Sequence, residues 1–103
     1  MIRVKAGVIF HPRTFQTEMC RMILAAQSEA PEDYNPTITS GCDGKHCKNS
    51  SHYSGHAFDF RTRDLNDMTT KVWADRMQMV LGSYYNVLLE LDPPHIHVGY
   101  HGP

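Results

Sequence analysis

The chain has 103 residues, of which 41% are hydrophobic and 20% charged, and its formal net charge is -1. A chain of this length supports one hydrophobic core, because a small domain buries only about two thirds of the surface that its unfolded chain exposes. The balanced charge provides no field that would draw the protein onto nucleic acid or anionic lipid. The composition therefore predicts one globular domain over residues 1–103 and no nucleic-acid partner. We expect the chain to be a monomer.

No apolar run approaches the ~20 residues that a membrane-spanning helix needs, and the N-terminus lacks a signal-peptide pattern. We therefore expect synthesis in the cytoplasm without a signal peptide or a transmembrane segment, so that another factor delivers the protein to any site outside the cell. The odd cysteine count favours free thiols over a fully paired disulfide framework. Cys42 and Cys47 could still pair, or contribute to a metal site, because both lie in one polar stretch.

The N-terminal third contains one expected helix. Arg3 to Phe10 mixes β-branched and small residues and predicts an edge strand or an extended arm. The helix is expected to begin at Phe15, with Thr14 as its N-cap, and to end before Pro31. Apolar residues at helical spacing predict its buried face, and they are Phe15, Met19, Met22, Ile23 and Ala26.

Two expected strands flank a polar loop in the middle of the chain. The segment Pro36 to Ser40 predicts a short strand, and Gly41 to Ser51 is rich in loop-forming residues. The next strand is expected over Ser54 to Thr62, where alternation places Phe58 on one face and Asp59 on the other. An aspartate in the middle of a strand departs from strand propensity and needs a reason.

The C-terminal part predicts a helix and a hairpin. Asp64 and Asp67 are expected to cap the helix and form its first turn, and Gly82 to end it. Its expected apolar face consists of Met68, Val72, Trp73, Met77, Val80 and Leu81. The fold class is therefore α+β, with two helices packed on one face of a small, mostly antiparallel sheet.

The hairpin is expected to join strands at Tyr84 to Leu91 and His95 to Tyr100. Two successive prolines at its turn cannot adopt positive φ angles, so the loop is expected to be wider than two residues. A symmetrical widening pairs Glu90 with His97 across the hairpin.

Histidine is the unusual feature of the composition, since the chain has seven. Five of them form two short clusters, and these are His46, His52, His56, His95 and His97. His95 and His97 are two residues apart, so on a strand they point to the same side. The same alternation places Asp59 and Glu90 on that face of the sheet. His52 lies just before its strand and would have to fold back over this face. Nitrogen and oxygen ligands with an adjacent carboxylate predict a catalytic zinc site on the sheet face opposite the helices.

The segment from Ser50 to Asp59 resembles the SxHxxGxAxD signature of a family of zinc peptidases, and His95-Ile96-His97 resembles its HxH motif. The family joins D-alanyl-D-alanine carboxypeptidases, vancomycin-resistance D,D-dipeptidases and phage L-alanyl-D-glutamate endolysins, with the hedgehog signalling domain as a relative. Asp43-Gly44-x-His46 resembles the hedgehog-type branch and small phage members. The resemblance covers about Thr37 to Tyr100, and two linked motifs in the right order are a specific signal.

The resemblance implies one zinc ion per chain. Its ligands would be His52, Asp59 and His97. Glu90 would be the general base, with Asp92 a lesser candidate. His46 and His95 would line the site, and Ser50 and Arg61 would bind substrate or orient a ligand. A neutral His95 or a protonated His46 is expected to stabilise the oxyanion. Cys42-Asp43 stands where many carboxypeptidase relatives have an aromatic residue followed by the arginine that holds a substrate carboxylate, and Arg61, Arg63 or Lys45 would have to replace that arginine.

The expected function is therefore a zinc metallopeptidase of phage or bacterial origin that hydrolyses peptide bonds in peptidoglycan stem peptides. It would act as a D,D-carboxypeptidase or as an endolysin-like endopeptidase, on the cell wall after release or as part of a virion. The alternative from another class is a non-catalytic, hedgehog-like zinc module that binds protein or cell wall. A plain α+β domain without metal is the third alternative.

Overall fold

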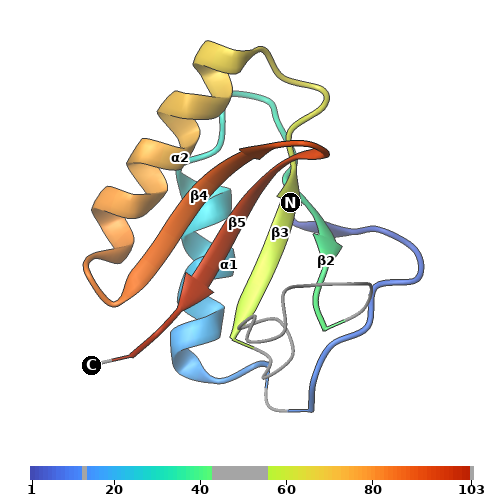
Figure 1. Ribbon diagram of the computed structural model, residues 1–103, viewed down its shortest axis with the longest axis vertical. Coiled ribbons are helices and arrows are strands. Elements are labelled where there is room, and N and C mark those ends of the chain that lie inside the picture. The colour runs from blue at the N-terminus through green and yellow to red at the C-terminus, as the bar shows by residue number, and fades with distance from the viewer. Residues whose placement is uncertain (13, 43–55, 103) are drawn as a thin grey trace.

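The computed structural model describes residues 1–12, 14–42 and 56–102. Its centre is a five-stranded sheet in the order β1-β2-β3-β5-β4 (Figure 1). The strands are β1 (Arg3–Val4), β2 (Thr37–Ser40), β3 (Ala57–Arg61), β4 (Tyr85–Leu91) and β5 (Pro94–Tyr100), and the helices are α1 (Thr17–Ser28) and α2 (Asp67–Leu81). The β1–β2 pair is parallel and the other neighbouring pairs are antiparallel. The expected α+β fold with a mostly antiparallel sheet is confirmed.

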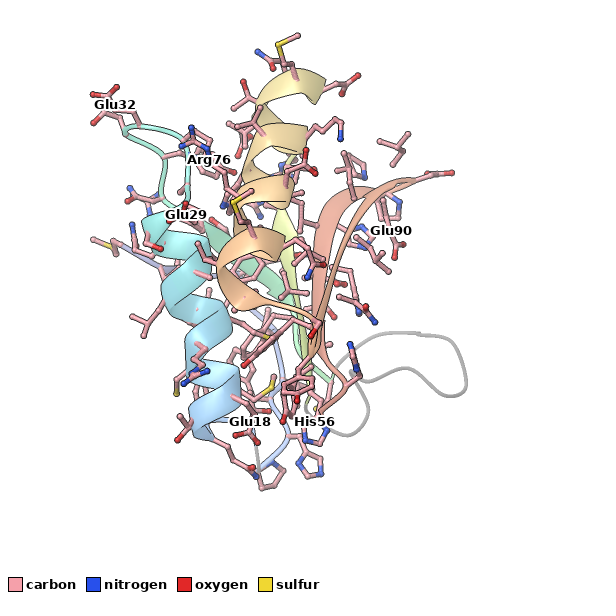
Figure 2. The ribbon with its side chains drawn as sticks, turned by 90° about the vertical axis from the view of Figure 1, so that its left-hand side faces the viewer. Glu18, Glu29, Glu32, His56, Arg76 and Glu90 are labelled. Atoms are coloured by element: carbon pink, nitrogen blue, oxygen red, sulfur yellow. The ribbon has the colours of Figure 1, made fainter. Side chains whose placement is uncertain are left out.

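Both helices pack on the same face of the sheet, and this layer holds the core (Figure 2). Phe58 and Phe60 of β3 alternate onto that face and are fully buried. The residues packed with them include Met19, Met22, Ile38, Trp73, Met77, Ile96 and Val98. Each large apolar side chain buried in this way contributes about 1.5–3 kcal/mol of transfer free energy. The indole nitrogen of Trp73 also donates a hydrogen bond to the Ala26 carbonyl at 3.2 Å, which joins α2 to α1.

The first helix begins later than expected. The residue before its first turn is Gln16, so Thr14 as its N-cap is wrong. Thr14 is instead buried, and its amide closes a turn onto the His11 carbonyl at 2.9 Å. Phe15 is 61% exposed because it lies before the helix and not on its buried face, and its ring packs edge-on with that of Phe10. At the N-terminus the expected strand is reduced to the two edge residues of β1.

The second helix is capped by Asn66 and not by Asp64, because the Asn66 side chain accepts a hydrogen bond from the Thr69 amide at 2.8 Å. Gly82, at φ 88°, ends the helix as expected. Trp73 and Met77 of the expected apolar face are buried. Thr70 and Ala74 complete the buried side of α2 together with these two residues. Met68, Val72 and Val80 therefore lie on the other side of the helix and are exposed.

The hairpin has a tighter turn than expected. Leu91 pairs with Pro94, so only Asp92 and Pro93 connect the strands, through a cis peptide bond. The expectation of a wider loop is wrong because it considered turns that need positive φ angles, whereas type VI turns accommodate a cis-proline. Glu90 consequently pairs with His95, and the expected pairing of Glu90 with His97 is also wrong. The observed register differs from the expected one by two residues on β5, which is an even number. Every side chain therefore keeps its predicted face of the sheet.

Gln78 of α2 closes part of the outer edge of β4. Its side-chain amide donates to the Tyr85 carbonyl at 2.9 Å and accepts from the Val87 amide at 2.9 Å. These two bonds satisfy backbone groups that point away from β5 at the sheet edge. Within the described residues, no helix is long and apolar enough to cross a membrane.

Tyr34 links the helical layer to β3 and makes the stability of the fold depend on pH in the alkaline range. Its hydroxyl donates to the Arg61 carbonyl at 3.1 Å, and its ring packs edge-on against Trp73. Burial, and then the negative charge of Asp64, raises the pKa of Tyr34 above its usual value of 10.0. A raised pKa in the folded state means that the protonated hydroxyl stabilises the fold fully below the unfolded pKa, and that this stability is lost as pH rises through the folded pKa.

Tyr34→Phe is therefore expected to cost about 1 kcal/mol near neutral pH, through the lost hydrogen bond. It is also expected to make stability decline less steeply than in the native chain above about pH 10. Denaturant unfolding at a series of pH values measures both effects. A residual decline is expected because burial also raises the pKa of Tyr85. Tyr84→Phe, at an exposed position, is the control; equal slopes in native and Tyr34→Phe chains would contradict the assignment.

Candidate functional site

The centre of the candidate site is a pair of residues on neighbouring strands. Asp59 of β3 and His97 of β5 are direct partners in the antiparallel register, and both point to the sheet face without helices. His97 Nδ1 lies 3.2 Å from Asp59 Oδ1. Their side chains are only 12% and 17% exposed, respectively. The alternation that buries Phe58 and Val98 on the helical face is therefore what brings these two polar groups together.

A second row lies beside this pair, with one residue on each of three strands. Arg61 of β3 pairs with His95 of β5, which pairs in turn with Glu90 of β4. His95 Nε2 lies 3.5 Å from Glu90 Oε2 and 3.9 Å from Asp59 Oδ1. Figure 2 shows Glu90 on the side of the sheet away from the helices, and half of its side chain is exposed. The arrangement thus combines two low-exposure imidazoles, one low-exposure carboxylate and one accessible carboxylate.

The position of Asp59 in the middle of β3 now has a physical account. A carboxylate removed from water is costly unless positive or hydrogen-bonding groups compensate it. Two imidazole nitrogens lie within 4 Å of Asp59 Oδ1. On the other side, the Thr39 hydroxyl donates to the Asp59 backbone carbonyl at 3.4 Å, and the strand register shifts between Ile38 and Ser40. Such a carboxylate favours a hydrogen-bond donor or a metal cation as its partner.

The donor atoms of this pair suit zinc. Zinc takes nitrogen and carboxylate oxygen ligands in a tetrahedron, and two such ligands at about 2.1 Å from the metal lie about 3.4 Å apart. The separation of 3.2 Å between His97 Nδ1 and Asp59 Oδ1 is close to that value. Among the residues that the structure describes, no group of three or more His, Cys, Asp or Glu side chains is arranged to hold a metal ion. The third expected ligand, His52, lies outside the described residues.

Some of the other expected site residues lie outside the described part of the chain, and these are Lys45, His46 and Ser50. The remaining ones are described. Arg61 is half-buried on the same face as Glu90 and His95. Arg63 is exposed and lies 4.0 Å from Asp64, in the connection that follows β3. Asp92 is exposed in the hairpin turn. Cys42 carries a free thiol, as does Cys20.

The Pro93 carbonyl oxygen is a further group near the site that sequence reasoning missed. It lies 2.6 Å from His95 Nδ1. Pro93 precedes His95 by two residues, and groups at this spacing in a tight turn can come within hydrogen-bonding distance. The sequence alone did not predict the contact, because it predicted a wider loop between the two strands than the structure has.

Comparison of the chain with protein-family models, with curated proteins and with solved structures found no match.

Proposed function

We propose that the chain is a zinc-dependent peptidase that hydrolyses peptide bonds in the stem peptides of bacterial peptidoglycan. The observation that carries the proposal is the pairing of Asp59 with His97 at 3.2 Å, beside a row formed by His95 and Glu90. The SxHxxGxAxD and HxH motifs point to the same chemistry and to the substrate class.

Asp59 and His97, together with His52, would hold the zinc ion. Zinc in such a site lowers the pKa of water to about 7 and polarises the scissile carbonyl. Asp59 would offset part of the metal charge, and its strand β3 is paired on both sides, with β2 and with β5. His97 is anchored in the same way between β3 and β4. Two of the three ligands would thus come from interior strands of the sheet, and regular elements hold a site more precisely than loops do.

Glu90 would act as the general base. Its carboxylate is half exposed, so water and substrate reach it, and it lies on the strand next to the one that carries both histidines of the HxH motif. It would take a proton from water as the carbonyl is attacked and give that proton to the leaving amine. Asp92 remains a lesser candidate for this role because it lies in the turn, two residues after Glu90.

The substrate would be bound beside this row. Arg61, directly opposite His95, offers a guanidinium to a carboxylate of the peptide, and a bidentate pair of that kind also fixes orientation. His46 and Ser50 would complete the site from the segment before β3. Cleavage of a terminal D-alanine and cleavage within the stem peptide are both compatible with such a site. The protein would act as a monomer on the cell wall, after release from the cytoplasm or from a virion.

The test combines metal content with product analysis. Elemental analysis of the purified chain is expected to find about one zinc per molecule. A peptidoglycan digest is expected to release peptides with new amine ends, to stop with a chelator and to resume with added zinc, and mass spectrometry of the products identifies the bond that is cut. Stoichiometric zinc without cleavage would replace the proposal by a zinc-stabilised binding module. Absence of zinc would overturn it.

A further inference from the structure

The last residues of β4 form an open edge of the sheet. β4 is the outermost strand on this side, and its residues from Leu88 to Leu91 are all exposed. Across the hairpin Leu91 pairs with Pro94, which has no N–H, so this is a non-hydrogen-bonded pair. Hydrogen-bonded and non-hydrogen-bonded pairs alternate along antiparallel strands, so the backbone N–H and C=O groups of Leu89 and Leu91 point away from β5.

Gln78 confirms this direction and closes only the first half of the edge. Its side-chain amide bonds to the Tyr85 carbonyl and to the Val87 amide, which belong to the same alternating set as Leu89 and Leu91. Within the described part of the chain, no group bonds to the outward backbone atoms of these two leucines. Unpaired backbone groups on an exposed edge strand are a template for the addition of a further strand.

A cavity lies beside this edge, on the face of the sheet that carries the helices. Its volume is about 230 Å³; Leu89, Leu91 and Pro94 line it from the hairpin, and Leu65 and Thr70 line it from α2 and the connection before it. An engineered protein cavity of about 150 Å³ binds benzene, so this volume admits one aliphatic side chain. Leu91 is 72% exposed, so apolar surface is left uncovered beside the cavity.

The residue between the two leucines points to the opposite face of the sheet. Glu90 lies there with half of its side chain exposed (Figure 2). A strand that pairs with Leu89 and Leu91 would turn the side chains opposite these two residues toward the cavity, and the side chain between them toward the Glu90 carboxylate. Opposite charges that face each other across two strands stabilise the pairing. The edge therefore fits an apolar, a basic and an apolar residue in succession.

A second copy of this chain does not fit the edge. Two identical edges pair antiparallel through both leucines in one register, with Leu89 of each copy opposite Leu91 of the other. That register sets Glu90 directly opposite the Glu90 of the second copy, and like charges so placed are destabilising. A shift by two residues in either direction uses Pro93, which has no N–H, or Val87, whose amide is already hydrogen-bonded within the chain.

We propose that the edge of β4 at Leu89 and Leu91 binds an extended segment of another protein, in which a lysine or arginine lies between two aliphatic residues. The segment adds a further strand to the sheet, antiparallel to β4. Its backbone bonds to both leucines, one of its aliphatic side chains enters the cavity, and its basic side chain pairs with Glu90. The proposal uses the charge of Glu90 and not its chemistry, so it does not depend on the proposed function.

The probe is the synthetic peptide Thr-Val-Lys-Val-Thr, blocked at both ends and titrated into the full-length, ¹⁵N-labelled chain as purified. NMR measures hydrogen exchange at each amide. Exchange at Leu89 and Leu91 is expected to slow at least about tenfold in the complex, because both N–H groups gain a carbonyl partner. An affinity weaker than about 1 mM, or protection confined to other amides, would overturn the proposal. Slowing of the same exchange by a higher concentration of the chain alone would assign the edge to a second copy, and would overturn it as well.

N-methylated peptides provide the matched control for the strand pairing. Methylation of either valine nitrogen removes a donor aimed at β4 and is expected to weaken binding about tenfold. The lysine backbone nitrogen points away from β4, so its methylation is expected to weaken binding less than about twofold. Equal losses for the valine and lysine positions would show that the peptide does not extend the sheet, against the proposal.

Charge reversal tests the register. Thr-Val-Glu-Val-Thr is expected to bind the native chain about fivefold more weakly than the lysine peptide, and Glu90→Lys is expected to reverse this order. Both chains keep Leu89 and Leu91, so only the facing charge differs between them. The same order of the two peptides in both chains would show that the basic residue does not face Glu90, and the proposal would fail.

Discussion

His97→Ala is expected to abolish both zinc binding and hydrolysis of peptidoglycan peptides. Removal of a group that merely orients a zinc ligand already costs about 10–100-fold in metal affinity, so loss of a ligand costs more. His97 is also the cross-strand partner of Asp59, and its loss leaves that low-exposure carboxylate with less compensation. Elemental analysis and equilibrium zinc titration measure the binding, and release of peptide products measures the turnover.

The matched control is His101→Ala, which removes an exposed histidine beyond the end of β5. This control is expected to retain native zinc content and native turnover. Asp59→Asn keeps the shape of the second ligand and removes its charge, so it is expected to lower zinc affinity without disturbing the sheet. Native zinc content in both His97→Ala and Asp59→Asn, with folding verified by circular dichroism, would show that the metal site lies elsewhere.

Glu90→Ala is expected to keep about one zinc per chain and to lose about 10²–10⁴-fold in turnover, the contribution of a general base. Zinc is retained because the Glu90 carboxylate lies one strand beyond the Asp59–His97 pair. The fold is expected to be retained because half of the Glu90 side chain is exposed. Parallel measurements of zinc content and of kcat separate this outcome from loss of a ligand.

Two further carboxylate variants make the result specific. Glu32→Ala removes an exposed glutamate on the helical side of the molecule, away from Glu90 (Figure 2), and is expected to change neither zinc nor turnover. Asp92→Ala tests the other candidate for the base. Near-native turnover of Glu90→Ala together with a large loss in Asp92→Ala would transfer the role of base to Asp92.

The alternation of side chains was readable from the sequence by itself. Phe58 and Phe60 had to face a core, so Asp59 had to face away from it, and the same parity placed His95 and His97 together on β5. The two helices and the α+β class follow from apolar residues at helical spacing and from the glycine at the end of α2. These features depend on residues close in the chain, where the period of the backbone leaves one arrangement that buries the apolar side chains.

The tertiary structure decided where the helices begin, which apolar residues they bury and how the hairpin is registered. Thr14 and Asp64 have good capping side chains, but a turn onto His11 and the Asn66 side chain took precedence. Met68 and Val72 fit the helical period, yet they are exposed because the direction of α2 is set by its packing on the sheet. The turn at Asp92 and Pro93 paired Glu90 with His95. Each of these features is a choice between local alternatives of similar free energy, and contacts between distant residues make that choice.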